Sequence, residues 1–163
     1  IPSTEGLPAM RLPRPAMLAT WFATWVALGA SAQSATAPAG MVKRVAGNVI
    51  LQRAGVGKPT APGAAVLVGD SIRTGADGAV GITLTDDTLL TVGANSELVL
   101  SDYSFDSTTQ EGSLLASLWR GTAAVVTGLI GKKAPEKVRV QTRTVVLGVR
   151  GTEFIVDAGQ PKP

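Results

Sequence analysis

The main candidates for chemistry in this chain of 163 residues are carboxylates, lysines and arginines, because it contains no cysteine and no histidine. The chain therefore lacks a thiolate nucleophile, an imidazole base and the usual ligands of zinc, copper and haem. Asp86 and Asp87 could form a catalytic pair, but their surroundings predict a solvated hairpin tip, and acid–base catalysis needs a perturbed environment. We expect no enzymatic activity, no cofactor and no metal.

Two other groups of residues have the composition of a ligand site without its spacing. Asp102, Asp106 and Glu111 could offer oxygen ligands to calcium, but their spacing matches no calcium-binding loop, so we expect a solvated loop. The Gly-Lys pair at residues 57–58 is followed by Pro59, where a phosphate-binding loop requires Ser or Thr. The sequence therefore predicts neither a calcium loop nor a nucleotide-binding loop.

Five basic residues lie close together in the C-terminal part of the chain. Lys137, Arg139 and Arg143 stand at odd positions of a predicted strand, so we expect them to share one of its faces. Lys132 and Lys133 lie just upstream. The five cations form either a solvated face that protects a sheet edge from aggregation, or a docking surface for an acidic partner or an envelope polyanion.

A nucleic-acid partner is not expected. The formal net charge is only +3, and the basic residues are dispersed along the chain. After the first 32 residues, the aromatic side chains are too few to form a platform on which bases stack. They are Tyr103, Phe105, Trp119 and Phe154.

Arg150 lies between Gly148 and Gly151 in segment 138–156, which is the longest run rich in β-branched residues. Glycine within a strand pattern marks a bulge, a bend or a close backbone approach, so we expect Arg150 to be held in a fixed place. It is either a structural cation that satisfies carbonyls or a carboxylate, or a contact to an anion or a partner. As a structural cation, its expected partner is Asp70.

The beginning of the chain predicts export. Residues 1–9 show no pattern, whereas residues 10–32 have the basic start, short apolar run and small-residue exit of a cleavable secretory signal. A membrane anchor needs about 20 strongly apolar residues, and this run is diluted by Ala, Thr and Ser. We expect cleavage after Ala32, a polar linker over residues 33–40, and a periplasmic or secreted bacterial protein that keeps no stable membrane span.

From residue 41 onward, short apolar runs alternate with turn residues, and no run is long enough for a convincing helix. This pattern predicts an all-β domain of many short strands over residues 41–157, followed by a tail over residues 158–163. Segment 128–136 is expected to be a loop. Strands this short favour a β-roll or an irregular β-solenoid, with a β-sandwich as the alternative.

Several motifs resemble the FecR-like periplasmic domain family. Residues 47–49 (Gly-Asn-Val) open the first matching strand, segment 68–75 resembles the family's GD-x-I-x-TG turn, and segment 82–88 resembles its L-x-L-x-DG-T hairpin. The most specific part joins residues 140–142 to residues 148–154 and is close to V-x-TP…VRGT-x-F. The motif residues with an expected structural role are Gly69, Asp70, Gly148, Arg150, Gly151 and Thr152.

The resemblance covers about residues 41–156 and has two departures: Asp87 stands where glycine is usual, and Arg143 where proline is common. The best-known members carry a cytoplasmic anti-sigma segment and a membrane span before this domain. Here only residues 10–32 are expected to precede the mature chain, so that arm is expected to be absent. The resemblance implies a non-catalytic sensor-type module that binds an envelope protein, with a sigma-factor pathway left open. The alternative is a cell-envelope structural or glycan-associated module.

Overall fold

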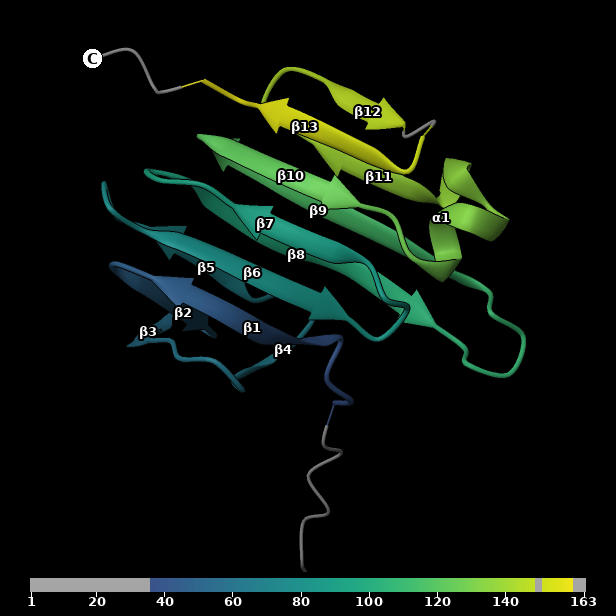
Figure 1. Cartoon of the computed structure of the whole chain (residues 1–163), viewed down its shortest axis with the longest axis horizontal. Coiled ribbons are helices and arrows are strands. Elements are labelled where there is room, and N and C mark those ends of the chain that lie inside the picture. The colour runs from purple at the N-terminus through teal and green to yellow at the C-terminus, as the bar shows by residue number, and fades with distance from the viewer. Residues whose placement is uncertain (1–35, 149–150, 160–163) are drawn as a thin grey trace, which may run out of the picture. The chain divides into compact units, whose positions relative to one another are not determined.

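Alternation of apolar with polar or small residues produces thirteen strands in the part of the chain that the computed structural model describes, residues 36–148 and 151–159. The chain divides into a unit of residues 1–34 and a unit of residues 35–163, and all thirteen strands belong to the second unit. They form a six-stranded and a seven-stranded open sheet, which Figure 1 shows as two layers. The predicted all-β fold is therefore confirmed.

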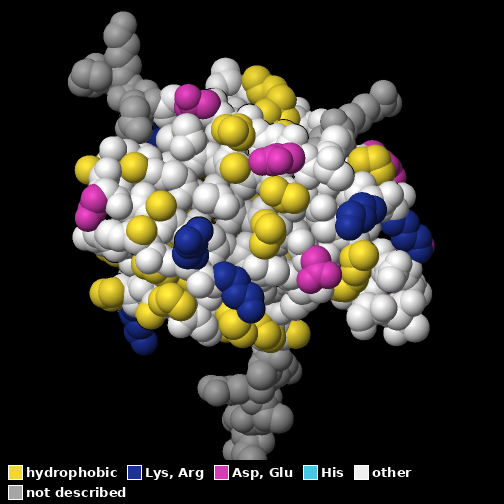
Figure 2. Space-filling model, in the orientation of Figure 1, with side chains coloured by type: hydrophobic (Ala, Val, Ile, Leu, Met, Phe, Trp, Pro, Cys, Tyr) yellow, Lys and Arg dark blue, Asp and Glu magenta, His cyan; other side chains and the backbone are white. Residues whose placement is uncertain are grey.

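The six-stranded sheet has the order β13-β10-β7-β6-β1-β4. Its members are β1 (Gly40–Ala46), β4 (Ala65–Val66), β6 (Ala79–Leu84), β7 (Leu89–Val92), β10 (Thr122–Val126) and β13 (Glu153–Asp157). All of its strand pairs are antiparallel. Its outer face carries scattered hydrophobic side chains, with both signs of charge interspersed (Figure 2).

The seven-stranded sheet has the order β12-β11-β9-β8-β5-β2-β3. Its members are β2 (Val49–Arg53), β3 (Val56–Pro59), β5 (Ser71–Thr74), β8 (Glu97–Phe105), β9 (Gly112–Arg120), β11 (Val138–Gln141) and β12 (Val146–Gly148). Here β9 and β11 pair in parallel, whereas the other pairs are antiparallel. The chain winds between the two sheets: β1 lies in one, β2 and β3 in the other, and β4 returns to the first.

One apolar core lies between the sheets. Alternate residues of each strand point inward, so Leu98 and Leu100 of β8 and Ala123 and Val125 of β10 are at most 1% exposed. Complete burial of a leucine or valine side chain stabilises the fold by about 1.5–3 kcal/mol. The intervening residues, such as Val99 of β8 and Ala124 of β10, are only partly buried.

Segment 128–136, predicted as a loop, contains helical structure, so that prediction was wrong. It forms the helix α1 (Leu129–Lys133) and the beginning of the 3₁₀ turn η1 (Pro135–Lys137). Gly128 lies so close to the β6–β7 hairpin that a Cβ there would be 2.0 Å from the backbone oxygen of Asp86. Glycine is thus needed where the chain enters α1. The sequence did not predict this helix because so short a helix is stabilised by tertiary contacts and has no helical repeat of apolar residues to reveal it.

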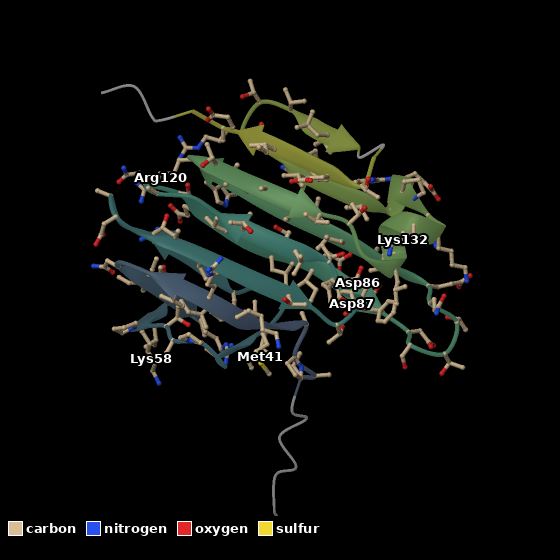
Figure 3. All side chains as sticks on the ribbon, in the orientation of Figure 1. Met41, Lys58, Asp86, Asp87, Arg120 and Lys132 are labelled. Carbon is tan, nitrogen blue, oxygen red and sulfur yellow. The ribbon has the colours of Figure 1, made fainter. Side chains whose placement is uncertain are left out.

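The prediction of a solvated Asp86 was also wrong, because this residue is fully buried. Its carboxylate accepts hydrogen bonds from Thr88 Oγ1 at 2.7 Å, from the Tyr103 hydroxyl at 3.1 Å and from the Ile130 amide at 3.4 Å. The Leu129 amide donates to the Asp86 carbonyl at 2.7 Å. Figure 3 shows Asp86 at the end of the molecule that carries α1. Asp86 therefore joins the hairpin, strand β8 and the start of α1.

Tyr103 completes this network from β8. Its hydroxyl accepts a hydrogen bond from the Asp86 amide at 3.0 Å and shares one with the Thr85 hydroxyl at 2.8 Å. Burial is the main cause that raises the pKa of Tyr103 from 10.0 to about 12. The fold therefore favours the neutral phenol.

Replacing Asp86 by Asn should lower the free energy of unfolding by about 1–3 kcal/mol, because an amide would face groups that now donate to a carboxylate. Asp87→Asn is the matched control: Asp87 is exposed and has φ of 66°, a conformation that Asn tolerates. Urea unfolding should show a loss for the first variant and no loss for the second. Equal stability of the two variants would contradict a structural role for Asp86.

Tyr103 is the only tyrosine in the chain, so absorbance near 295 nm reports its ionisation directly. The native chain should ionise with a midpoint at about 12, and the denatured chain near 10.0. Because the folded-state pKa is raised, the stabilisation from Tyr103 is complete below pH 10.0 and is lost as the pH rises towards about 12. A native midpoint near the denatured one would show that the hydroxyl lies in water.

Candidate functional site

The three cations that were predicted to share one strand face, Lys137, Arg139 and Arg143, do not lie on one strand. Only Arg139 belongs to β11, where it is exposed between Val138 and Val140, each 0% exposed. Lys137 ends η1, and Arg143 lies beyond the end of β11, in the turn towards β12. The prediction of a shared face was wrong because it assumed a longer strand: β11 covers only residues Val138–Gln141.

Lys137 and Arg139 line a surface groove of about 650 Å³ on the outer side of the seven-stranded sheet. The far end of the β8–β9 hairpin supplies the rest of the lining, including three carboxylates. These carboxylates belong to Asp102, Asp106 and Glu111. The acids that we predicted to lie in a solvated loop are thus brought together with two of the predicted cations.

Strand register defines the width of the groove. Asp102 on β8 and Arg139 on β11 are both paired with Leu115 on β9, from its two sides. Neighbouring strands lie about 4.8 Å apart, so the backbones of Asp102 and Arg139 are separated by about 10 Å. Leu115, which is only partly buried, forms the floor between a carboxylate and a guanidinium.

Neighbouring groups orient the charges on both sides of the groove. Ser113 Oγ donates to Asp102 Oδ2 at 3.2 Å, and Arg139 Nε donates to the Glu136 carbonyl at 3.3 Å. The amides of Thr109 and Thr108 donate to the Asp106 carboxylate, and these bonds lower its pKa. Asp106 is therefore ionised over the whole physiological range.

We call Asp102, Asp106 and Glu111 the acidic wall, and Lys137 and Arg139 the basic wall. Among residues 36–148 and 151–159, no ion pair joins one wall to the other, and each ion pair that forms there involves Asp70 or Glu97. Both walls therefore present charged atoms to the groove that are not neutralised across it. Charges arranged in this way can contact a ligand without first breaking an internal ion pair.

The lysines of α1 have different surroundings. Lys133 Nζ donates to the Thr109 carbonyl at 2.5 Å, and this bond ties the helix to the β8–β9 loop. Lys133 and Lys137 also line a smaller hollow of about 210 Å³, which shares Glu111 with the main groove. Lys132 is exposed on α1 (Figure 3). A role of these lysines in partner binding stays a prediction.

The Gly69–Asp70 turn has a partner that the sequence analysis missed. Arg53 Nε and Nη2 donate to the two oxygens of Asp70 at 2.8 and 2.7 Å, and the Leu67 amide adds a bond at 2.8 Å. The side-chain hydrogen bond to Asp70 raises the pKa of Arg53. Gly69 has φ of 89°, which favours glycine in this turn. The antiparallel pairing of β2 with β5 is the feature that places Arg53 beside this turn.

The other predicted motif residues lie near the open edge of the structure. Gly148 ends β12, with open space where a Cβ would be, and the carbonyls of Gly151 and Thr152 accept hydrogen bonds from Thr127. Arg150 lies outside the described residues. Its predicted pairing with Asp70 therefore stays a prediction, although Arg53 already binds both carboxylate oxygens of Asp70.

Two further findings concern metals and membranes. Within the described ranges, no group of three or more His, Cys, Asp or Glu residues is placed to hold a metal ion. The helices among these same residues are too short and too polar to cross a membrane.

Comparison with known proteins gives one match. The model of the family described as FecR protein matches residues 70–162, which is more than half of the 163 residues. The match begins at Asp70 and includes both walls of the groove. Residues 47–49, which also resemble the family, lie outside the matched range. No curated protein and no solved structure matches the chain.

Arg53→Ala should lower the free energy of unfolding by about 1–3 kcal/mol, because it leaves the carboxylate of Asp70, whose side chain is 1% exposed, without its cation. Arg73→Ala is the control, since Arg73 pairs with Glu97 at a more exposed site and should cost about 0–1 kcal/mol. Urea unfolding measures both variants. A double-mutant cycle of Arg53→Ala with Asp70→Asn should give non-additive losses, and additive losses would contradict the contact.

Proposed function

The chain belongs to the FecR family, and on that premise we propose that it is a periplasmic protein-interaction module without catalysis, resembling the sensor domain of FecR-type regulators. The all-β architecture supports this function, because two facing sheets offer a rigid surface on which side chains keep fixed positions. Family membership supports a regulatory, sensor-type role. The particular surface and its partner are our own proposal.

The observation that carries this proposal is the groove with two opposed charged walls. Its charges are exposed, oriented by neighbouring groups and not neutralised across the groove. Charges of this kind mainly accelerate association and select the partner, rather than stabilising the fold. We therefore assign the partner contact to Lys137 and Arg139, while Lys132, Lys133 and Arg143 are further candidates at its rim.

Export of the chain is part of the proposal. The predicted signal peptide, residues 10–32, and the first three residues of the linker over residues 33–40 lie outside the described residues. The strands of the described residues run from Gly40 to Asp157, so the first strand begins one residue before the boundary that the sequence predicted for the β domain. We propose that the mature chain begins at Gln33 and that this domain faces the periplasm.

Capture from envelope extract tests this function. The bait is the chain recovered from the periplasm, whose first residue mass spectrometry should place at or near Gln33. Wild-type bait should retain a protein partner, and the binding should weaken as salt rises. Reversing Lys137 and Arg139 to Glu should lower the binding about tenfold without changing the melting temperature.

The control carries the same change in charge away from the groove. Lys43→Glu with Lys58→Glu alters exposed lysines of β1 and β3, which lie in the other sheet and at the opposite edge. This bait should bind like the wild type. Unchanged binding by the Lys137 and Arg139 variant would contradict the assigned surface. Retention on isolated peptidoglycan without a protein partner would favour the glycan-associated alternative.

A further inference from the structure

We propose that the groove is a binding site for an aliphatic zwitterion, and that its ligand is the C-terminal lysine of the protein partner. The proposal rests on the proposed function, since that function supplies the partner. It adds the chemical class of the group that the partner inserts. A lysine at a chain end carries a carboxylate and an ammonium group, joined by an aliphatic stem.

The three components of such a ligand match three parts of the groove. The carboxylate faces Arg139 and Lys137, and Arg139 has guanidinium nitrogens beyond the Nε that binds Glu136. The ammonium faces the acidic wall, where Asp102 is oriented by Ser113. The aliphatic stem lies over Leu115, since lysine stems pack along apolar surface while their charged heads stay in water.

A ligand with one sign of charge fits less well. A polyanion would contact the basic wall but bring like charge against Asp102, Asp106 and Glu111, which lowers affinity. A simple cation would meet the opposite problem at Lys137 and Arg139. A zwitterion satisfies both walls at once, and the groove volume of about 650 Å³ is typical of small-ligand sites.

The excess of carboxylates favours a C-terminal lysine over a zwitterion that carries a second carboxylate. Three acids face two cations in the lining, so the ligand should carry no excess of negative charge. A C-terminal lysine supplies one carboxylate and one ammonium group. A cell-wall peptide with a diamino acid supplies a second carboxylate for the same ammonium group, and that carboxylate would face the acidic wall.

The direct test uses 6-aminohexanoate, whose ammonium and carboxylate groups lie at the two ends of an aliphatic chain. Amide shifts in NMR titrations of the exported chain should show saturable binding in the groove, and hexanoate and hexylamine should bind at least about fivefold more weakly. A peptide ending in lysine with a free carboxylate should bind, and its C-terminal amide should not. Equal binding of hexanoate, or of the amide, overturns the proposal.

Variants of the acidic wall separate a zwitterion from a polyanion. Glu111→Gln and Asp102→Asn should each weaken the binding of 6-aminohexanoate at least about threefold. If the groove recognised anions alone, removing these acids would instead strengthen the binding of 6-aminohexanoate through its carboxylate. That result overturns the proposal. Asp87→Asn removes an exposed carboxylate outside the lining and should leave the affinity unchanged.

Competition separates failure of this inference from failure of the proposed function. If the inference holds, 6-aminohexanoate should displace the captured partner. A partner that is lost on reversing Lys137 and Arg139, but not displaced by 6-aminohexanoate, leaves the function standing and overturns the zwitterion site. Binding of 6-aminohexanoate without any protein partner overturns the function. Tighter binding of a diamino-acid wall peptide than of the lysine peptide overturns the choice of ligand.

Discussion

One buried carboxylate holds together the end of the molecule on which the groove depends. Asp86 binds its own hairpin through Thr88, strand β8 through Tyr103, and the start of α1 through Ile130. A buried carboxylate is tolerated only when hydrogen bonds replace its water, so each of these groups is constrained by the others. The basic wall follows α1 in the chain, and the acidic wall lies on and beyond β8. Asp86 thus fixes the elements that carry both walls.

The parallel pairing of β9 with β11 explains why opposite charges meet across one leucine. Parallel neighbours need a crossover, which β10 and α1 provide by passing through the other sheet and returning. The crossover places Arg139 beside Leu115, while the antiparallel β8–β9 hairpin places Asp102 on the other side. Residues far apart in sequence therefore face one another, although neither segment alone has the pattern of a binding motif.

Strand positions could be predicted because alternation of apolar residues is a local signal, and the buried Val138 and Val140 around Arg139 show it. The surroundings of charged residues depend on strand order, which alternation does not encode. Asp86 was therefore predicted to be solvated, and Arg53 was not recognised as the cation beside Asp70. Asp102, Asp106 and Glu111 were judged by their spacing in sequence, whereas strand pairing is what places Asp102 across Leu115 from Arg139.

The same parallel pairing has a consequence for the order in which the chain folds. The β8–β9 hairpin forms from neighbouring residues, whereas β11 can join β9 only after the loop through β10 and α1 has closed. Contacts with long sequence separation form slowly, because chain entropy is lost before the strand pairing contributes favourable free energy. The acidic side of the groove can therefore assemble before the basic side. A chain that is still folding therefore presents only half of the groove, and the complete groove appears with the native state.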